Sequence, residues 1–431
     1  MKTHIKQLFL LPALITVLGF IPAGRVTAQT FTILHTFNYG SDDGGFPEAS
    51  LILSGNTLYG TTYEGGSATF GTVFSVNTNG AGFTILYSFT QGTNGGYPQA
   101  GLILLGNTLY GTTRNGGGTG LGTVFAVNTN GTGFTNLYNF STIQTNSVGA
   151  YTNSDGAVPL SGLISSGNTL YGTTAFGGSG GYGTVFAISN NGTGFTTLHG
   201  FTAGTEGVYP QAGLILSGNT LYGTAGGGGS SGAGTVFAIM TDGTRYTNLH
   251  SFTATSSYTN SDGAYPKAAV ILSGNTLYGT AQYGGTSGSG TVFKVNPDGL
   301  NFTTLYSFRR LSNSSPFTNS DGAYPEAALI LSGNTLYGTA YQGGSVGLGT
   351  VFSLSLGAVS APPPQLTIIR SGANVILTWS TSATGFTLQS TTNLVSTAVW
   401  ITNAPAPVVI NGQNAVTNPI AGTRKFYRLS Q

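Results

Sequence analysis

Cysteine is absent from this 431-residue chain, and charge is scarce, since only 6% of residues are Asp, Glu, Lys or Arg. The chain therefore has no disulfide framework, no thiolate nucleophile and no cysteine metal site. The sparse cations argue against nucleic acid or an anionic membrane as a partner, because both require a dense basic surface.

The N-terminal segment differs in composition from the rest of the chain. Lys2 and Lys6 precede an apolar run from Leu8 to Phe20, and small residues come before Gln29. This run is too short and too early for a stop-transfer helix, so residues 1–28 are predicted to be a secretory signal peptide, with a retained anchor as the alternative. We expect a secreted protein, extracellular or at the cell surface, without membrane insertion once the signal is removed.

Three short motifs recur along the chain. The hexapeptide NTLYGT begins at Asn56, Asn107, Asn168, Asn219, Asn275 and Asn334, and GTVF starts 15 residues after each of these asparagines. An aromatic element of pattern [FY]-T-x-L-[YH]-x-F follows the first five GTVF copies, and its sixth copy stands first, as FTILHTF at Phe31–Phe37. The chain therefore holds six copies of each motif, but the sixth aromatic copy stands at the start of the repeats instead of at their end. This arrangement predicts a closed ring, because the ends of an open solenoid are capped rather than joined.

Each repeat has the pattern of four short strands rich in β-branched and aromatic residues, with no helical period. Asn-Gly or Asp-Gly pairs between the last two strands predict type I′ hairpin turns and antiparallel pairing. Such units, repeated six times and closed on themselves, predict an all-β fold with a six-bladed β-propeller over residues 29–358, closed by the N-terminal strand. The glycine of NTLYGT is expected to let neighbouring sheets approach closely.

The SGNTLYGTT…GG…GTVF pattern, followed by a YSF-type strand, resembles the GloVer (Gloeo/Verruco) tandem repeat of exported bacterial proteins. The resemblance spans about residues 31–356 and rests on six copies of the motif. It implies an extracellular repeat protein and carries over no catalytic residues.

A different module follows the repeats. Residues 359–365 form a proline-rich linker, and residues 366–431 contain seven short candidate strands and both tryptophans, Trp379 and Trp400. This pattern predicts a small β-sandwich of immunoglobulin or fibronectin type III kind, with Trp379 in its core.

The loops that lead from one repeat to the next vary in length, and with the glycine-rich loops they are expected to share one face of the propeller. Variation confined to one face marks a binding surface, although neutral drift is the alternative. One repeat position on this face is mostly acidic, and ring symmetry would arrange its six members in a circle. These ring positions are Asp43, Asn94, Asp155, Glu206, Asp262 and Asp321, with Glu48 and Glu326 nearby. Ordinary Asp-Gly turn chemistry is the structural alternative.

Three of these loops share the pattern [YF]-T-N-S-D-G-A, which contains a fragment of a calcium-binding loop. The candidate metal ligands are Asn153, Asp155, Asn260, Asp262, Asn319 and Asp321. The EF-hand pattern also needs an acid two residues earlier and a Glu at its twelfth position, and both are missing. We therefore expect no cofactor, with Ca²⁺ as the alternative.

No residue is predicted to be catalytic. His35, His199 and His250 share one repeat position with three tyrosines, which indicates packing rather than acid–base chemistry. We expect a secreted, non-enzymatic binding or cell-surface protein, monomeric, with an extracellular glycan or protein as ligand. The alternative is an extracellular carbohydrate-active enzyme, a glycosidase or lyase that uses the carboxylates of the loop face.

Overall fold

A computed structural model of the chain describes residues 32–147, 149–356, 365–381, 386–393, 399–402, 406–420 and 424–430. The predicted signal peptide and residues 359–364 of the predicted linker lie outside the described residues. The chain divides into two compact units. The first holds the first two repeats, the second holds the fourth to sixth repeats and the C-terminal region, and the third repeat is shared between the units.

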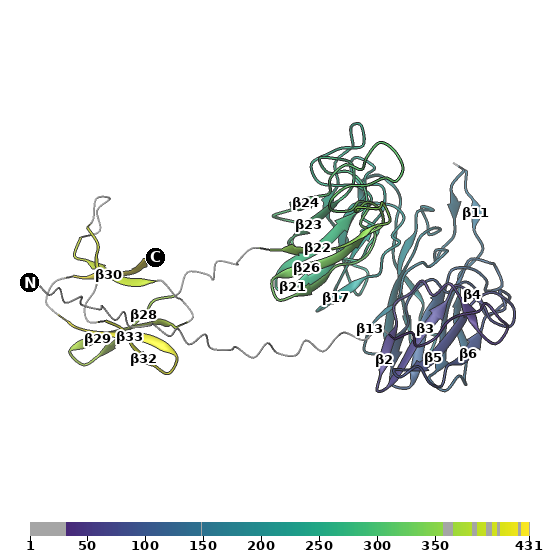
Figure 1. Cartoon of the computed structure of the whole chain (residues 1–431), viewed down its shortest axis with the longest axis horizontal. Coiled ribbons are helices and arrows are strands. Elements are labelled where there is room, and N and C mark those ends of the chain that lie inside the picture. Colours follow the sequence, from purple (N-terminus) through teal and green to yellow (C-terminus); the bar gives the residue numbers. More distant parts are fainter. Residues whose placement is uncertain are drawn as a thin grey trace, which may run out of the picture. The chain divides into compact units, whose positions relative to one another are not determined.

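The fold is all-β, and each of the first five repeats forms one four-stranded sheet in which neighbours along the chain pair (Figure 1). In the first repeat these strands are β2 (Ile52–Ser54), β3 (Thr57–Thr62), β5 (Thr72–Asn77) and β6 (Thr84–Ser88). The next sheets are β7 (Ile103–Leu105), β8 (Thr108–Thr113), β9 (Thr123–Asn128) and β10 (Thr135–Asn139); β13 (Ile164–Ser166), β14 (Thr169–Thr174), β15 (Thr184–Ser189) and β16 (Thr196–Gly200); β17 (Ile215–Ser217), β18 (Thr220–Ala225), β19 (Thr235–Met240) and β20 (Thr247–Ser251); and β21 (Ile271–Ser273), β22 (Thr276–Ala281), β23 (Thr291–Val295) and β24 (Thr303–Ser307).

Short elements in the loops complete the repeats. They are β1 (Gly44–Gly45), paired with β4 (Glu64–Gly65), and β11 (Gln144–Thr145), paired with β12 (Tyr151–Thr152). The single 3-10 turn η1 (Gly204–Glu206) is the sole helical element among the described residues. No helix in this described part of the chain has the length and apolar character needed to cross a membrane.

NTLYGT supplies the second strand of every sheet, and its glycine has a definite packing role. In β8, a Cβ atom on Gly111 would lie 2.6 Å from the ring of Phe125 and 2.9 Å from Leu102. Phe125 lies in β9, which pairs with β8, and Leu102 directly precedes β7 of the same repeat. The glycine therefore makes room for the phenylalanine of its own GTVF strand. Its expected role in the approach of neighbouring sheets stays a prediction.

The Asn-Gly turns also differ from the prediction. In the first repeat, the N–H of Gly80 donates to the carbonyl of Asn77 at 2.8 Å, and Gly80 alone of the two turn residues has positive φ, at 82°. A type I′ turn needs positive φ at both central residues. The structure instead closes a type I turn with a left-handed glycine, and the Asn79 side chain accepts the Ala81 N–H at 3.0 Å. The predicted antiparallel pairing of β5 and β6 is confirmed.

One interface recurs between consecutive sheets within each unit. In the first unit, Tyr59 and Val73 of one sheet pack on Leu102, Leu109 and Phe125 of the next. The same repeat positions build the clusters between the fourth and fifth sheets and between the fifth and sixth sheets of the second unit. NTLYGT and GTVF therefore recur because each sheet must offer the same two faces to its neighbours.

The sixth repeat has three strands, β25 (Ile330–Ser332), β26 (Thr335–Ala340) and β27 (Thr350–Ser355). Residues 32–40 form no strand, so the predicted pairing of the N-terminal segment with β27 is not seen among the described residues. The segment packs on the first sheet instead. His35 stacks on Phe83 at 3.5 Å between ring centroids, and Phe37 meets Phe74 edge-on at 5.3 Å.

Those two contacts repeat what the fourth strand of each sheet does to the next sheet. Tyr87 stacks on Phe134 at 3.5 Å, and Phe89 meets Phe125 edge-on at 5.1 Å. The N-terminal segment thus contacts the first sheet as the fourth strand of a preceding sheet would.

The C-terminal region contains seven strands among its described residues, in two sheets of four and three strands. The sheets are formed by β28 (Thr367–Ser371), β29 (Asn374–Ser380), β33 (Gln413–Pro419) and β32 (Val408–Ile410), and by β31 (Ile401–Thr402), β30 (Thr387–Thr391) and β34 (Phe426–Ser430). Leu377, Trp379 and Val416 of the first sheet share a core with Leu388 of the second. Trp379 is 2% exposed, so its predicted place in the core is confirmed.

Candidate functional site

The loops between repeats and the glycine-rich loops meet at one end of each sheet. Isolated backbone bridges join them at Gly96 and Asn115, at Ala264 and Tyr283, and at Ala323 and Gln342. Within these repeats, the prediction that the two kinds of loop share one face is confirmed.

Each repeat has a proline at one equivalent position, and the residue before that proline has a left-handed backbone. The φ angle lies between 55° and 60° at Phe46, Tyr97, Val158, Tyr209, Tyr265 and Tyr324. Bulky side chains rarely adopt this conformation, and it persists only where the surroundings determine it. In the fifth repeat the Tyr265 N–H donates to Ala233 at 2.7 Å, and the Tyr265 carbonyl accepts from Gln282 at 3.1 Å. The aromatic residue is therefore held rigidly at the loop end of the sheet.

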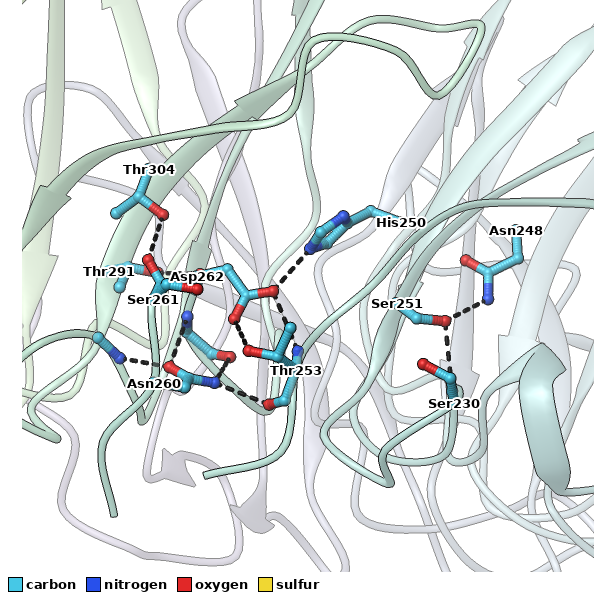
Figure 2. Close-up of polar contacts among 12 residues, drawn as sticks. Ser230, Asn248, His250, Ser251, Thr253, Asn260, Ser261, Asp262, Thr291 and Thr304 are labelled. Atoms are coloured by element: carbon cyan, nitrogen blue, oxygen red, sulfur yellow. Dashed lines mark hydrogen bonds and ion pairs between the residues drawn. The ribbon is translucent and has the colours of Figure 1, made fainter. Parts of the chain in front are cut away.

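The ring position of the fifth repeat is buried and fully engaged. The Asp262 carboxylate, 5% exposed, lies 3.0 Å from His250 Nε2 and accepts hydrogen bonds from the backbone N–H of Thr253, at 3.0 Å, and from its hydroxyl (Figure 2). Burial alone would raise the pKa of Asp262, but the hydrogen bonds from His250 and Thr253 outweigh it and lower the pKa. This ionised carboxylate fastens the loop to the preceding strand.

The same partnership recurs at other ring positions. Asp321 accepts from the Tyr306 hydroxyl at 2.6 Å, and Asp43 lies 2.9 Å from His35 Nε2. The amide of Asn94 donates to the hydroxyl of Tyr87, and Glu206 lies 3.5 Å from His199 Nε2. Histidine and tyrosine interchange at this strand position because each offers a polar tip to the following loop.

Three of the ring positions are too buried to offer their carboxylates to a ligand on the surface. Asp43, Asp155 and Asp262 are buried, at 3%, 2% and 5% exposure. The two flanking acids, Glu48 and Glu326, are both exposed, and Glu326 accepts from the Gln282 amide and lies 4.0 Å from Lys267 Nζ. The buried carboxylates Asp43 and Asp262 serve as partners for neighbouring parts of the chain, and ligand binding at the other positions stays a prediction.

The asparagines proposed as metal ligands hold two loops together. Asn260 Oδ1 accepts from Gly263 at 2.9 Å and from Gly285 of the glycine-rich loop at 2.8 Å, while its Nδ2 donates to the Gly263 carbonyl at 2.7 Å (Figure 2). Asn153 and Asn319 make the equivalent contacts. Across the described ranges, no group of three or more His, Asp or Glu residues is placed to hold a metal ion. Calcium binding stays an untested prediction.

A recess of about 860 Å³ lies in the second unit, at the loop ends of the fifth and sixth repeats. We call it the aromatic cleft, because five aromatic side chains line it: Tyr258, Tyr265, Tyr283, Phe317 and Tyr324. Tyr283 lies between two of them, with ring centroids 5.7 Å from Tyr265 and 5.3 Å from Tyr324. The ring planes meet at 82° and 67°, so neighbouring rings form corners rather than one flat platform.

The polar lining of the aromatic cleft is almost uncharged. Ser287, Ser312, Asn313 and Gln342 supply neutral hydrogen-bonding groups, and Arg310 is the single charged residue among the lining residues. Burial, followed by the nearby Glu326, raises the pKa of Tyr283. Its hydroxyl is protonated at neutral pH, as in any tyrosine, and can donate or accept a hydrogen bond. The arrangement can hold a ligand that combines apolar faces with many hydroxyl or amide groups.

Sequence reasoning emphasised the ring positions and missed this cleft. The signals were present in the same motifs, in the aromatic residue that precedes the proline in five of the six repeats and in the first residue of [YF]-T-N-S-D-G-A. Tyr258 and Phe317, at that first position, are 83% and 45% exposed.

A family model described as the Gloeobacter/Verrucomicrobia repeat matches residues 23–158 and 144–352. The chain belongs to this repeat family. The match covers all six NTLYGT copies, and so it confirms the resemblance drawn from the motifs. No curated protein matches the chain.

Solved structures show distant likeness. A nidogen/laminin complex chain is 12% identical with a TM-score of 0.39, covering 70% of this chain and 89% of its own. The GH74 enzyme of Niastella koreensis is 16% identical with a TM-score of 0.45, covering 75% and 49%. A putative 6-phosphogluconolactonase from Bacteroides uniformis is 14% identical with a TM-score of 0.42, covering 87% and 98%. Scores this low do not bear on the activity of the chain.

Proposed function

We propose that the chain is a secreted, non-enzymatic protein that binds an extracellular glycan or protein on the loop face of a six-bladed propeller. The observation that carries this proposal is the aromatic cleft, whose lining combines exposed rings with neutral polar groups. Pockets of this size and composition are typical of ligand-binding sites. Residues 1–28 would direct export.

Ring closure is part of this proposal, and the exposure of the two end repeats supports it. The GTVF valine is fully buried in the first five repeats, at Val73, Val124, Val185, Val236 and Val292. Its counterpart Val351 in β27 is 82% exposed. At the other end, Leu51 is 51% exposed, whereas the equivalent Leu329 is 3% exposed. Each end therefore bears the face that matches the other, and a closed ring would bury both within a monomer.

The C-terminal region would serve as a spacer or attachment module. Its two sheets share the Trp379 core, which fits a small sandwich of immunoglobulin or fibronectin kind. Nothing in this role requires catalysis.

The alternative, a glycosidase or lyase, receives less support from the geometry. A hydrolase of this kind needs two carboxyl groups free to face the substrate. The aromatic cleft has no Asp or Glu among its lining residues, and Asp262 and Asp321 accept backbone N–H groups of their own loops, from Thr253 and Arg309. We therefore favour binding without turnover.

The two functions separate in one experiment. The full chain is incubated with a panel of polysaccharides and surface proteins, and both retention and release of products are measured for wild type and for Asp262→Asn. Retention without product release is expected for wild type. Sugar release that Asp262→Asn abolishes, with the melting temperature unchanged, would establish the enzyme and refute the binding proposal.

A further inference from the structure

We propose that the aromatic cleft binds the pyranose rings of an oligosaccharide, with Tyr283 as the central stacking surface. This inference rests on the proposed binding function and names the ligand class for it. A pyranose has an apolar C–H face and a rim of hydroxyl groups. It therefore needs an aromatic face beside neutral hydrogen-bonding partners, and it needs no charge.

The cleft offers both kinds of group within reach of each other. Tyr265 and Tyr283 are 43% and 39% exposed, although each also packs against another ring. Aromatic side chains exposed to this extent combine a large apolar surface with a polar tip, which suits a ligand that is itself amphipathic. The amides of Asn313 and Gln342 provide donors and acceptors at the edge.

The backbone segments that carry several rings of the cleft are tied together by hydrogen bonds within the chain. The left-handed backbones of Tyr265 and Tyr324 are each fixed by two backbone hydrogen bonds. Asn260 ties the loop that carries Tyr258 to the glycine-rich loop that carries Tyr283. A preorganised site loses less conformational entropy on binding, which favours weakly interacting ligands such as sugars.

Size and charge distinguish this ligand class from others. A recess of about 860 Å³ has room for a short oligosaccharide rather than a single sugar. Arg310 alone is too little positive charge for nucleic acid or a polyanion, and it can donate to sugar hydroxyls or to one uronate carboxylate.

The third repeat supplies a matched control. Phe176 occupies the repeat position of Tyr283, is 41% exposed, and meets Tyr209 at 5.4 Å and 61°, close to the geometry of Tyr283 and Tyr324. It does not belong to the lining of the aromatic cleft.

The test is calorimetric titration of the full chain with hexaoses of β-1,4-glucose, β-1,4-xylose, α-1,4-glucose and galacturonate, and with a proline-rich peptide. We expect at least one hexaose to bind wild type, Tyr283→Ala to weaken that binding by about tenfold or more, and Tyr283→Phe to weaken it less than about threefold. Phe176→Ala should change the affinity by less than about twofold, because it lies outside the cleft. If Arg310→Gln weakens binding of the galacturonate hexaose more than binding of the neutral hexaoses, the preferred ligand is an acidic sugar.

Three results would overturn the inference. Hexaose binding that Tyr283→Ala leaves unchanged places the sugar elsewhere, and equal losses in Tyr283→Ala and Phe176→Ala indicate a general effect on folding. Binding of the peptide but of no hexaose refutes the sugar assignment and leaves the proposed binding function standing. Failure of wild type to retain any glycan or protein in the wider panel refutes that function itself.

Discussion

Removing the Asp262 carboxylate should destabilise the loop that carries it. In Asp262→Ala, the Thr253 N–H, the Thr253 hydroxyl and His250 lose their shared acceptor. A hydrogen bond to a charged group contributes about 1.5–3 kcal/mol. Thr253 is exposed, so water replaces part of what is lost, and the three contributions do not add in full. We expect the free energy of unfolding to fall by about 2–4 kcal/mol.

The assay is thermal and urea unfolding of wild type, Asp262→Ala and a matched control, Asp298→Ala. For a domain of 150–250 residues, the expected loss corresponds to a melting temperature lower by roughly 5–15 °C. Asp298 also precedes a glycine, but it is exposed and accepts the Leu300 N–H at 2.9 Å. Its removal should cost less than about 1 kcal/mol. Equal losses in the two variants would refute the role assigned to the buried carboxylate.

Acid should remove the advantage of Asp262. Because its pKa is lowered in the folded chain, the carboxylate stabilises the fold above its unfolded pKa of about 3.9, and this contribution is lost as pH falls through the lower folded pKa. The difference in melting temperature between wild type and Asp262→Ala should therefore be constant near neutral pH and shrink below about pH 4. A difference that grows in acid would contradict the assigned sign.

Two further predictions test the packing and the histidines. Gly111→Ala should lower the free energy of unfolding by about 1–3 kcal/mol, because the new methyl group would lie 2.6 Å from the Phe125 ring. Gly118→Ala, which has nothing within 4 Å of its new methyl group, should be nearly neutral. Equal effects of the two substitutions in urea unfolding would contradict this prediction. Burial lowers the pKa of His199 despite Glu206, so the unfolded chain binds the proton more readily below its pKa of about 6.5. The melting temperature of wild type should therefore fall relative to that of His199→Tyr as pH decreases from 7 to 5. A constant difference in melting temperature over that range would contradict this prediction.

The repeats made most of the fold predictable. NTLYGT and GTVF formed a strand in every repeat because their β-branched and aromatic residues suit a pleated surface between neighbouring sheets. The aromatic element formed a strand in the first five repeats, whereas its N-terminal copy forms none among residues 32–40. The turn type was missed because Asn-Gly suits more than one hairpin. In the structure, the Asn79 side chain satisfies the Ala81 N–H and favours the longer turn.

The candidate site was harder to predict for two physical reasons. A sequence shows that Asp262 precedes a glycine, but the direction of its carboxylate depends on His250, 12 residues earlier on another element. The aromatic cleft joins loops of the fifth and sixth repeats, whose unequal lengths follow no period. Only the placement of both loops shows that Tyr258 and Phe317 line one recess.

A cysteine pair tests ring closure most directly, since the chain has no cysteine to compete. In the first repeat Thr72 pairs with Ser88, and the equivalent residues at the two ends are Thr350 in β27 and Thr36 in the N-terminal segment. A closed ring would bring their Cα atoms within the roughly 4.4–6.8 Å that a disulfide requires. Mild oxidation of Thr36→Cys/Thr350→Cys should then link one chain to itself, whereas Thr36→Cys/Thr335→Cys, at the far end of β26, should stay reduced. Free thiols in the first pair, or links between chains only, would contradict the closed ring.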